Sequence, residues 1–541
     1  MVEGDRLTAD PLAWLQARSN EHRITLPLLL WTANIHLTRG DNRGLSALSL
    51  AVLVATFAVL CWLLPRDVRA APGGRALFAT LLSLLVFTPV AAHNWVLGFS
   101  GNQWFLANLS AIGAIALLVR LRPGAALGAL APVVLVGAVG AFCHGTHLAL
   151  WPALVVGSLL LPTPRGAPLV LGVSGAAAAA FFSWGFGSPS RALPPAADAP
   201  SAFDFFRSYL GLLMTRDPER ARHWGTLAVA LGVAAVVAAL AARSPERRRE
   251  RLPWLLVLLY AAGNALGTSI GRARLGAQIA LSSRYASLPA LFWAAALVLL
   301  GLAVWQWEPR RPASRWAARA AFAAFALATL LPTLAVGRAR LEAYLARGQR
   351  HPLAALALLW RVEDTTALRT LTPAIEQLDW TRDFFVRVRH VPFDRAGDWP
   401  LGSSIEAPRA GGAPAGRWES AAPVAAGFLG IVGLVNNEWD GAERRQRVLL
   451  LDASGALRGG GVFVPRPRAP RPLLLRRAPL PFRWEGYLQR GCHGEITAWL
   501  ELRGSSELYP LRRTAGIDKV LAAEAAACAQ PVPGYAGLVR G

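Results

Sequence analysis

Long apolar runs separated by short polar loops fill the first two thirds of the chain. A helix needs about 20 apolar residues to cross a bilayer, and ten runs come near that length. They lie at about 44–64, 76–93, 103–120, 124–142, 147–163, 167–187, 224–242, 252–268, 286–306 and 316–337. No later run is long enough to span. The pattern predicts an α-helical polytopic membrane protein whose transmembrane domain covers residues 44–337.

The loops between these runs alternate in charge. "PRDVRAAPGGR" and "ARSPERRRERLP" are rich in arginine, whereas "HNWVLGFSGNQ" and "CHGT" contain none. Arginine-rich loops favour the cytoplasmic side of a membrane. Both termini and the loops 188–223 and 269–285 are therefore predicted to be extracytoplasmic. The first of these loops contains "FDFFRSYLGLLMT", which predicts a short amphipathic helix at the membrane surface.

The two ends of the chain differ from its middle. Residues 1–43 read as an extracytoplasmic loop with two surface helices, and we expect the chain to begin downstream of a first transmembrane helix. Residues 338–405 predict an extracytoplasmic helical segment, followed by a Gly/Pro/Ala linker near 406–416. Short alternating runs with turns at 453–455 and 503–505 then predict a small β-sandwich over 417–541.

Composition supports a membrane location. Hydrophobic residues make up 54% of the 541 residues, and the mean hydropathy is +0.36. The formal charge of +23 comes from arginines at the ends of apolar runs, so membrane topology accounts for it without nucleic acid. We expect a bacterial cytoplasmic (inner) membrane protein with the bilayer as a partner and with its C-terminal domain outside. Of the four cysteines, Cys492 and Cys528 fall in that outer domain, where an oxidising compartment would permit a disulfide. Two unpaired thiols are the alternative.

The first candidate cluster is "SNEHR". Glu21, His22 and Arg23 place a carboxylate, an imidazole and a guanidinium side by side, with Asp41 a little later. Such groups can deprotonate a hydroxyl and hold a phosphate. The alternative is a solvated loop whose polar residues cap a helix.

The second cluster is "HNWVLGFSGNQWF". His93, Asn94, Trp95 and Gln103 could line a sugar or lipid site, because indole rings stack on sugars and amides bind hydroxyls. An interfacial hairpin with an aromatic belt is the alternative. On the same predicted face, His144 and His147 lie three residues apart but lack a carboxylate partner for a metal site.

The third cluster is "GRARLGAQIALSSRY", which places Arg272, Arg274 and Arg284, followed by Tyr285, in a predicted outer loop. Guanidinium groups at headgroup depth can bind the phosphate of a lipid-linked donor. Ordinary contacts with phospholipid headgroups are the alternative. The sequence contains no motif for nucleotide binding and no metal-ligand motif, so a divalent metal stays open and the cofactor unknown.

These motifs together resemble a known arrangement. "NEHR" before the first intact span, "NWVLGF" after the second, a late "Gly-Arg...Ser-Arg-Tyr" loop and an outer β domain are similar to a poorly characterised group of bacterial polytopic membrane proteins. Their layout resembles the GT-C superfamily of integral-membrane glycosyltransferases. Members transfer a sugar from a polyprenyl-phosphate carrier to an acceptor on the outer side, with a catalytic Asp or Glu in the first outer loop.

The resemblance implies roles for residues of this chain. Glu21 matches the general base best, with Asp41 and Asp10 behind it. Arg284 and Arg272 would hold the carrier phosphate, and His22 and Arg23 would orient the base or bind the departing phosphate. The chain departs from the family in lacking the first transmembrane helix and the paired acidic motif, so an inactive fragment is one interpretation.

Three functions follow as hypotheses. The first is transfer of a sugar from a polyprenyl-phosphate-linked donor to a glycan, lipid or protein acceptor of the cell envelope. The second is an envelope polysaccharide polymerase or ligase. The third is a non-catalytic lipid-glycan transporter or assembly protein, but the spans contain almost no ionisable residues that ion coupling would require.

Overall fold

A computed structural model describes most of the chain and shows two compact units. One unit comprises Leu7–Tyr344, and the other comprises Leu345–Gly541 with Val2–Arg6. The described residues are 2–3, 6–7, 10, 18–19, 22–184, 196–242, 244–307, 311–372, 375, 378, 382, 401–405, 409–410, 415–435, 446–464, 482–491, 493–502 and 507–529.

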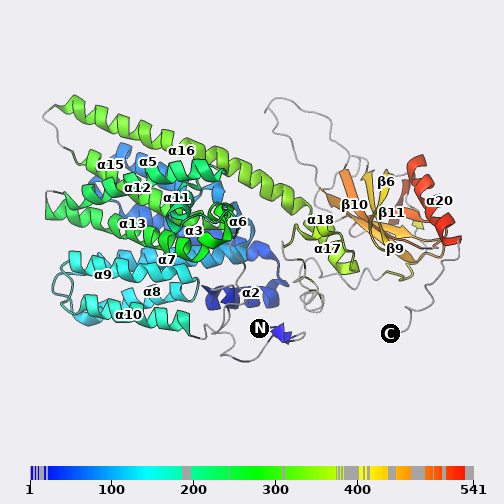
Figure 1. Cartoon of the computed structure of the whole chain (residues 1–541), viewed down its shortest axis with the longest axis horizontal. Coiled ribbons are helices and arrows are strands. Elements are labelled where there is room, and N and C mark those ends of the chain that lie inside the picture. The colour runs from blue at the N-terminus through cyan, green and yellow to red at the C-terminus, as the bar shows by residue number, and fades with distance from the viewer. Residues whose placement is uncertain are drawn as a thin grey trace. The chain divides into compact units, whose positions relative to one another are not determined.

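The first unit is a bundle of helices that run side by side (Figure 1). Its longer helices are α2 (Thr25–Thr38), α3 (Asn42–Leu63), α5 (Pro72–Val86), α7 (Gly98–Leu118), α8 (Ala131–Ala141), α9 (Leu150–Leu160), α10 (Ala167–Ser183), α11 (Ala202–Gly211), α12 (Pro218–Leu240), α13 (Pro245–Arg272), α15 (Ser287–Trp305) and α16 (Pro312–Gln349). Shorter elements connect them: α4 (Arg66–Ala70), η1 (Pro89–Ala91), α6 (Ala92–Val96), η2 (Leu127–Leu130), η3 (Gly145–Ala149), η4 (Ala273–Leu275), α14 (Ala277–Ala280) and η5 (Ser283–Tyr285).

Every predicted apolar run forms a helix, but the prediction of ten spans is too high. Within the described part of the chain, six helices are long and apolar enough to cross a membrane: α3, α5 with α6, α12, α13, α15 and α16. Three of the other four are shorter: α8 and α9 have 11 residues each and α10 has 17. These three are too short because turns and 3₁₀ segments interrupt the apolar runs. The six helices fit a multi-pass membrane protein.

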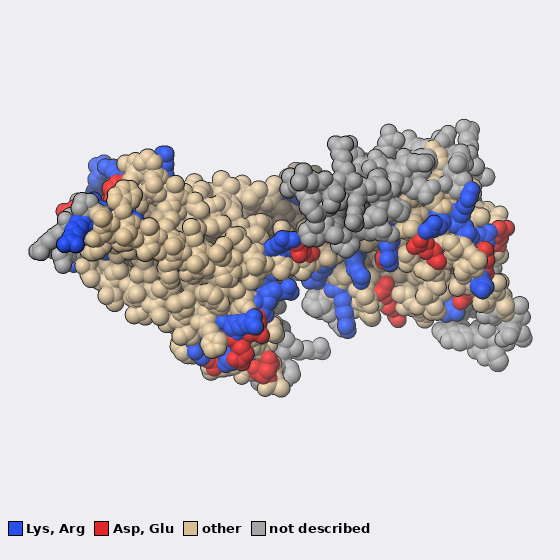
Figure 2. Space-filling view, turned by 90° about the horizontal axis from the view of Figure 1, so that it is seen from above, with Lys and Arg blue, Asp and Glu red and all other residues tan. Residues whose placement is uncertain are grey.

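The surface of the first unit is also apolar over much of its area. Figure 2 shows a broad band of uncharged residues on this unit, with arginines and acidic residues gathered toward its two ends. Large apolar side chains such as Leu135, Leu159 and Leu169 are more than half exposed on this unit, at 67%, 68% and 71%. Exposed leucines on apolar helices suit contact with lipid chains.

The segment predicted as a surface helix is instead packed into the bundle. Phe205 and Tyr209 of α11 are fully buried, and α11 lies closely against α12. Gly225 of α12 meets the carbonyl of Arg207, and a Cβ at this glycine would overlap that backbone. Glycine here permits a backbone contact that no other residue allows.

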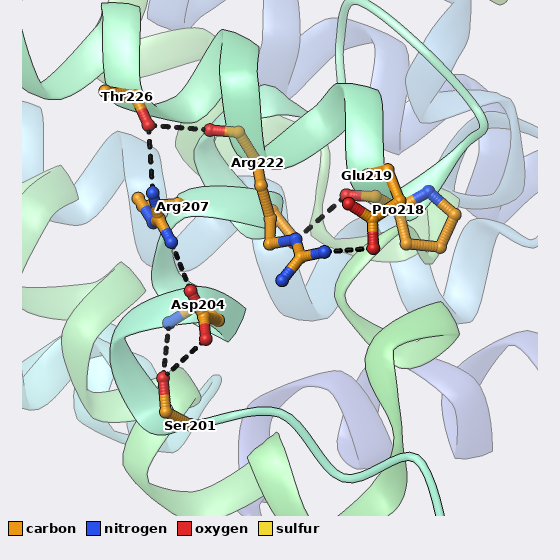
Figure 3. A network of polar contacts seen from close by, with 8 residues as sticks. Ser201, Asp204, Arg207, Pro218, Glu219, Arg222 and Thr226 are labelled. Atoms are coloured by element: carbon orange, nitrogen blue, oxygen red, sulfur yellow. Dashed lines mark hydrogen bonds and ion pairs between the residues drawn. The ribbon is translucent and has the colours of Figure 1, made fainter.

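A partly exposed polar network joins α11 and α12 (Figure 3). The Asp204 amide donates to the Ser201 hydroxyl at 3.0 Å, and the Arg207 guanidinium pairs with the Asp204 carboxylate and donates to Thr226 Oγ1 at 3.2 Å. The bond from Arg207 first, and then a bond from the Ser201 hydroxyl to Asp204 Oδ2 at 2.9 Å, lower the pKa of the Asp204 carboxyl. The network fixes the orientation of α11 against the start of α12.

The N-terminal region forms short strands and one helix. The strands β3 (Arg18–Ser19) and β4 (His22–Arg23) pair as a small hairpin, and the second predicted surface helix is present as α2. The first would fall on 11–17, which lie outside the described residues. Two further short strands, β1 (Val2–Glu3) and β2 (Arg6–Leu7), form a separate sheet.

The second unit is a closed β-barrel with helices, not the predicted sandwich. After α17 (His351–Trp360) and α18 (Thr365–Leu368), its strands are β5 (Arg409–Ala410), β6 (Gly416–Ala425), β7 (Phe428–Val435), β8 (Gln446–Leu451), β9 (Leu457–Val464), β10 (Phe482–Gln489), β11 (Thr497–Leu502) and β12 (Glu507–Arg512), followed by α20 (Ala515–Ala529). They pair in the order β11-β8-β9-β10-β7-β6-β12-β5, and β11 also pairs with β12. That additional pairing closes a ring of seven strands. A sandwich would leave the two sheet edges open.

The barrel core explains several of its glycines. Trp418 and Trp484 are fully buried and meet edge to face at 6.5 Å between ring centroids. A Cβ on Gly433 would overlap the Trp484 indole, whereas a Cβ on Gly430 of the same strand would lie 3.5 Å from its nearest neighbour. The predicted turn at 453–455 is present between β8 and β9, with Gly455 at φ +80°.

Candidate functional site

One cavity of the first unit gathers residues from all three candidate clusters or from their immediate neighbours. It has a volume of about 340 Å³. His22 comes from β4, Trp104 from α7, Arg272 from the end of α13 and Tyr285 from η5. The remaining lining comes from η3, α10 and α13: Gly145, Thr146, Leu148, Ala149, Phe182, Gly263, Asn264, Gly267, Thr268 and Gly271.

A series of aromatic ring contacts builds one side of this site. The His22 and His144 rings stack with centroids 3.9 Å apart, and His144 lies 4.0 Å from Trp104. Trp104 meets Tyr285 edge to face at 5.6 Å, and Tyr285 lies 5.4 Å from Tyr209 of α11. These contacts hold the hairpin β3–β4, α7, η5 and α11 in a fixed arrangement around the cavity.

Two arginines supply positive charge beside the rings. The Arg284 guanidinium carbon lies 5.1 Å from the centre of the Tyr285 ring, and its Nη2 donates to the Tyr285 hydroxyl at 3.4 Å. Its Nε is buried without a hydrogen-bond partner. Arg272 lines the cavity itself and is half-buried. The unpartnered Nε of Arg284 suits a ligand that brings oxygen acceptors.

Burial and the nearby positive charge both lower the pKa of His144. It lies in the connection between α8 and η3, where burial first, and then the charges of His22, Arg284 and Arg272, hold the pKa of its imidazole well below the usual range. Its ring is therefore neutral at pH 7. Its Nδ1 accepts from the Thr146 amide at 3.3 Å and caps η3, so its role is to hold the ring stack in place.

Asn264 adds an amide to the cavity. Its side chain is 2% exposed, and its Nδ2 donates to the Tyr260 carbonyl at 3.1 Å. Its Oδ1 has no hydrogen-bond partner, although it is buried in a residue that lines the cavity. An unsatisfied buried acceptor can accept a hydrogen bond from a ligand hydroxyl.

Other predicted residues have structural partners. The Asn94 amide donates to the Arg284 carbonyl at 2.9 Å and accepts from the Ser100 hydroxyl at 2.8 Å. His93 Nδ1 lies 2.8 Å from the Tyr344 hydroxyl. Asn94 therefore holds the backbone at Arg284 in place. Neither His93 nor Asn94 is part of the cavity lining.

Trp95 and Gln103 also lie apart from the cavity lining. Trp95 packs against the helical core with a buried Nε1, and Gln103 is half-buried on α7. Arg274 is exposed, and its carbonyl accepts from the Ala196 amide at 2.8 Å. The sugar site at His93, Asn94, Trp95 and Gln103 stays a prediction.

The residues of the first candidate cluster, "SNEHR" with Asp41, do not all lie at the cavity. Arg23 is fully buried, donates to the Trp184 carbonyl and lies 4.7 Å from the centre of the Phe181 ring, so it fastens the hairpin to α10. Asp41 is the N-cap of α3 and accepts from the Arg43 amide at 3.0 Å, so its carboxylate has a structural role. Glu21 lies outside the described residues, although the next residue, His22, lines the cavity.

The metal and disulfide predictions have different outcomes. His147 Nδ1 and Nε2 lie 3.0 and 2.7 Å from the carbonyl oxygens of Ala107 and Gly137, so its ring does not converge with His144 on one ligand. Within the described ranges, no three His, Cys, Asp or Glu side chains are grouped to hold a metal ion. Cys492 and the Cys528 side chain lie outside the described residues, so their disulfide stays a prediction that peptide mapping without reduction can test.

Sequence reasoning missed part of the site. Asn264 is a polar residue within the apolar run 252–268, and that position alone is a signal for function. Tyr209 and Phe182 carried no such signal because aromatic residues in apolar helices are ordinary. Comparison with known proteins adds no relative: no family model, no curated protein and no solved structure matches this chain.

Proposed function

We propose that this chain is a membrane glycosyltransferase that takes a sugar from a polyprenyl-phosphate-linked donor. One observation supports the proposal most: a single cavity combines the aromatic rings of Trp104 and Tyr285, the free amide oxygen of Asn264 and the guanidinium of Arg272. Aromatic faces bind the apolar faces of sugars, amides bind their hydroxyls, and arginines bind phosphate. The cavity therefore offers a partner for each part of a sugar phosphate: its apolar faces, its hydroxyls and its phosphate.

The lipid part of the donor also fits this surrounding. The cavity lies among helices with exposed apolar side chains, such as Leu266 at 51% and Ile270 at 69% on α13. A polyprenyl chain could lie along that surface while its phosphate meets Arg272 and its sugar enters the cavity. The acceptor would be a glycan, lipid or protein of the cell envelope.

The proposed reaction is a substitution at the anomeric carbon of the sugar. An acceptor hydroxyl oxygen forms the new bond to C1 while the bond between C1 and the phosphate oxygen breaks. The bonding electron pair leaves with the phosphate, and the hydroxyl proton passes to the Glu21 carboxylate. Arg272, with Arg284 against the Tyr285 ring, would stabilise the charge that develops on the departing phosphate.

Donor binding is the first test. The purified full chain is titrated with labelled polyprenyl-phosphate sugars, and the variants Arg272→Ala and Trp104→Ala are compared with Arg274→Ala. Losing a hydrogen bond to a charged group costs about 1.5–3 kcal/mol, so we expect Arg272→Ala to weaken binding by about 10- to 150-fold. Arg274 comes from the same segment but is exposed and does not line the cavity, so its variant should bind like the unmodified chain.

Transfer is the second test. Glu21→Gln should retain donor binding and lose transfer to the acceptor, because the amide cannot take the proton. Equal donor binding by Arg272→Ala and the unmodified chain would refute the proposed phosphate site. Donor binding without transfer to any acceptor by the unmodified chain would favour a non-catalytic lipid-glycan transporter or assembly protein.

A further inference from the structure

A second cavity lies at the opposite end of α13 and has a different lining. Its volume is about 340 Å³. It is formed by the end of α9, the end of α12 and the start of α13. The lining residues are Leu160, Leu161, Pro162, Ala239, Leu240, Pro245, Glu246, Arg248, Arg249, Leu252 and Leu255. Five leucines and two arginines therefore share one groove.

The groove follows from the two faces of α13. Arg247 and Arg251, one turn apart, point toward the protein: Arg251 donates to Gln306 Oε1 at 2.8 and 3.0 Å and to the Ala238 carbonyl at 2.6 Å, and Arg247 donates to the Gln306 carbonyl at 3.0 Å. Gln306 Nε2 donates in turn to Glu250 at 3.0 Å. This buried network holds the start of α13 against α12 and α15.

The neighbouring face of α13 carries Arg248, Leu252 and Leu255, which share one stripe at helical spacing, with Arg249 beside them. Arg248 and Arg249 are exposed, and each makes one long bond to a carbonyl, at 3.5 Å to Ala242 and 3.4 Å to Leu121. Most of their donors remain available. Glu246 is the one acidic residue in the lining, so the groove keeps a net positive charge.

The position of the groove along α13 suits a lipid headgroup. From Pro245 to Arg272 the helix has 28 residues, and at about 1.5 Å per residue it extends about 42 Å. That length matches a bilayer of about 40–45 Å with its headgroup regions. Arg248 and Arg249 then lie at one headgroup level, and Leu252 and Leu255 lie beneath them toward the hydrocarbon.

We infer that this groove binds one anionic glycerophospholipid. The headgroup phosphate meets Arg248 and Arg249, and an acyl chain lies against Leu160, Leu240 and Leu255. Leu160 and Leu240 are 45% and 46% exposed, so the groove is open on its apolar side. Basic pockets between apolar helices suit anionic headgroups. The site is separate from the proposed sugar-phosphate cavity and does not depend on it.

Native mass spectrometry of the full chain with added phosphatidylglycerol or phosphatidylcholine tests the inference. We expect one phosphatidylglycerol to be retained when phosphatidylcholine is stripped. Each arginine near an anionic headgroup strengthens lipid binding. The double variant Arg248→Ala/Arg249→Ala loses two of them, so we expect it to bind phosphatidylglycerol roughly 30-fold more weakly. Arg165→Ala is the matched control, because Arg165 is exposed in the connection after α9 but does not line the groove.

A second variant tests the apolar part without changing charge. Leu240→Trp places an indole in the groove and should also expel the lipid while the protein stays monodisperse. The inference is overturned if the double arginine variant retains phosphatidylglycerol, or if Arg165→Ala loses it equally. It is also overturned if inorganic phosphate competes as well as the lipid does, because the apolar wall would then contribute nothing.

Discussion

The turn between β8 and β9 depends on one carboxylate, and replacing it should open this part of the barrel. Asp452 Oδ1 accepts from the Ser454 and Ala456 amides at 2.9 and 3.0 Å, and Oδ2 accepts from Arg458 Nε at 2.7 Å. Asp452→Asn keeps one acceptor oxygen and loses the charged bond. A bond to a charged group contributes about 1.5–3 kcal/mol, and we take about 1.5 kcal/mol because the Arg458 side chain is 28% exposed.

Asp452→Ala also removes the acceptor of both amides and of the Ser454 hydroxyl, which donates to Oδ1 at 2.6 Å. At about 1 kcal/mol for each of these three bonds, added to the charged bond, the total comes to about 4.5 kcal/mol. Hydrogen exchange of the full chain, followed on peptides from β8 and β9, measures these local opening free energies. We expect exchange to be about 10-fold faster for Asp452→Asn and about 2000-fold faster for Asp452→Ala. Glu419→Gln breaks an exposed pair on β6 and should change little.

The loss of stability caused by Asp452→Asn should depend on pH. The hydrogen bond from Ser454 and those from Arg458 and the turn amides outweigh burial and hold the pKa of Asp452 well below its usual range. A carboxyl with a lowered folded-state pKa stabilises fully above its unfolded pKa of about 3.9, and this stabilisation disappears as the pH falls below that value. The difference between Asp452→Asn and the unmodified chain should therefore shrink below about pH 4. Equal exchange of both chains at pH 7 would refute the reasoning.

Two further predictions concern the same unit. The Tyr487 hydroxyl donates to Asp364 Oδ2 at 2.8 Å, so Tyr487→Phe should loosen α17 and α18 by about 1–2 kcal/mol, seen as faster hydrogen exchange there and not in α20. Gly433→Ala should lower the thermal stability of the barrel by about 1–3 kcal/mol because its Cβ would overlap Trp484, whereas Gly430→Ala on the same strand should cost less. A Gly433→Ala chain that melts like Gly430→Ala would contradict the packing seen at Trp484.

The sequence predicted the helices well and their lengths poorly. Apolar runs identify helices because burial or lipid contact requires apolar side chains over the whole run. The ends of α8 and α9 depend instead on local turns such as the one that His144 caps, and these leave little trace in hydropathy. The strands were likewise predicted, but sandwich and barrel bury alternate residues in the same way. Only the pairing of β11 with β12 distinguishes them.

The candidate site was predicted in part. Charge counting placed His22, Arg272 and Tyr285 on one predicted face, and all three line one cavity. It did not predict that Trp104 would contact His144, since Trp104 lies on α7, His144 lies in the connection between α8 and η3, and no periodicity relates them. Asp41 had the right chemistry, but its cap geometry ties it to α3.

The contact between α11 and α12 offers a way to find relatives of this chain. At Gly211 and Gly225 the two helices touch through their backbones, so even an alanine would force them apart. Drift can change the apolar residues around them freely, provided that volume is kept. A search should therefore weight glycine at these two positions, 14 residues apart, above overall similarity. Distant homologues that general similarity cannot detect would be expected to retain this spacing.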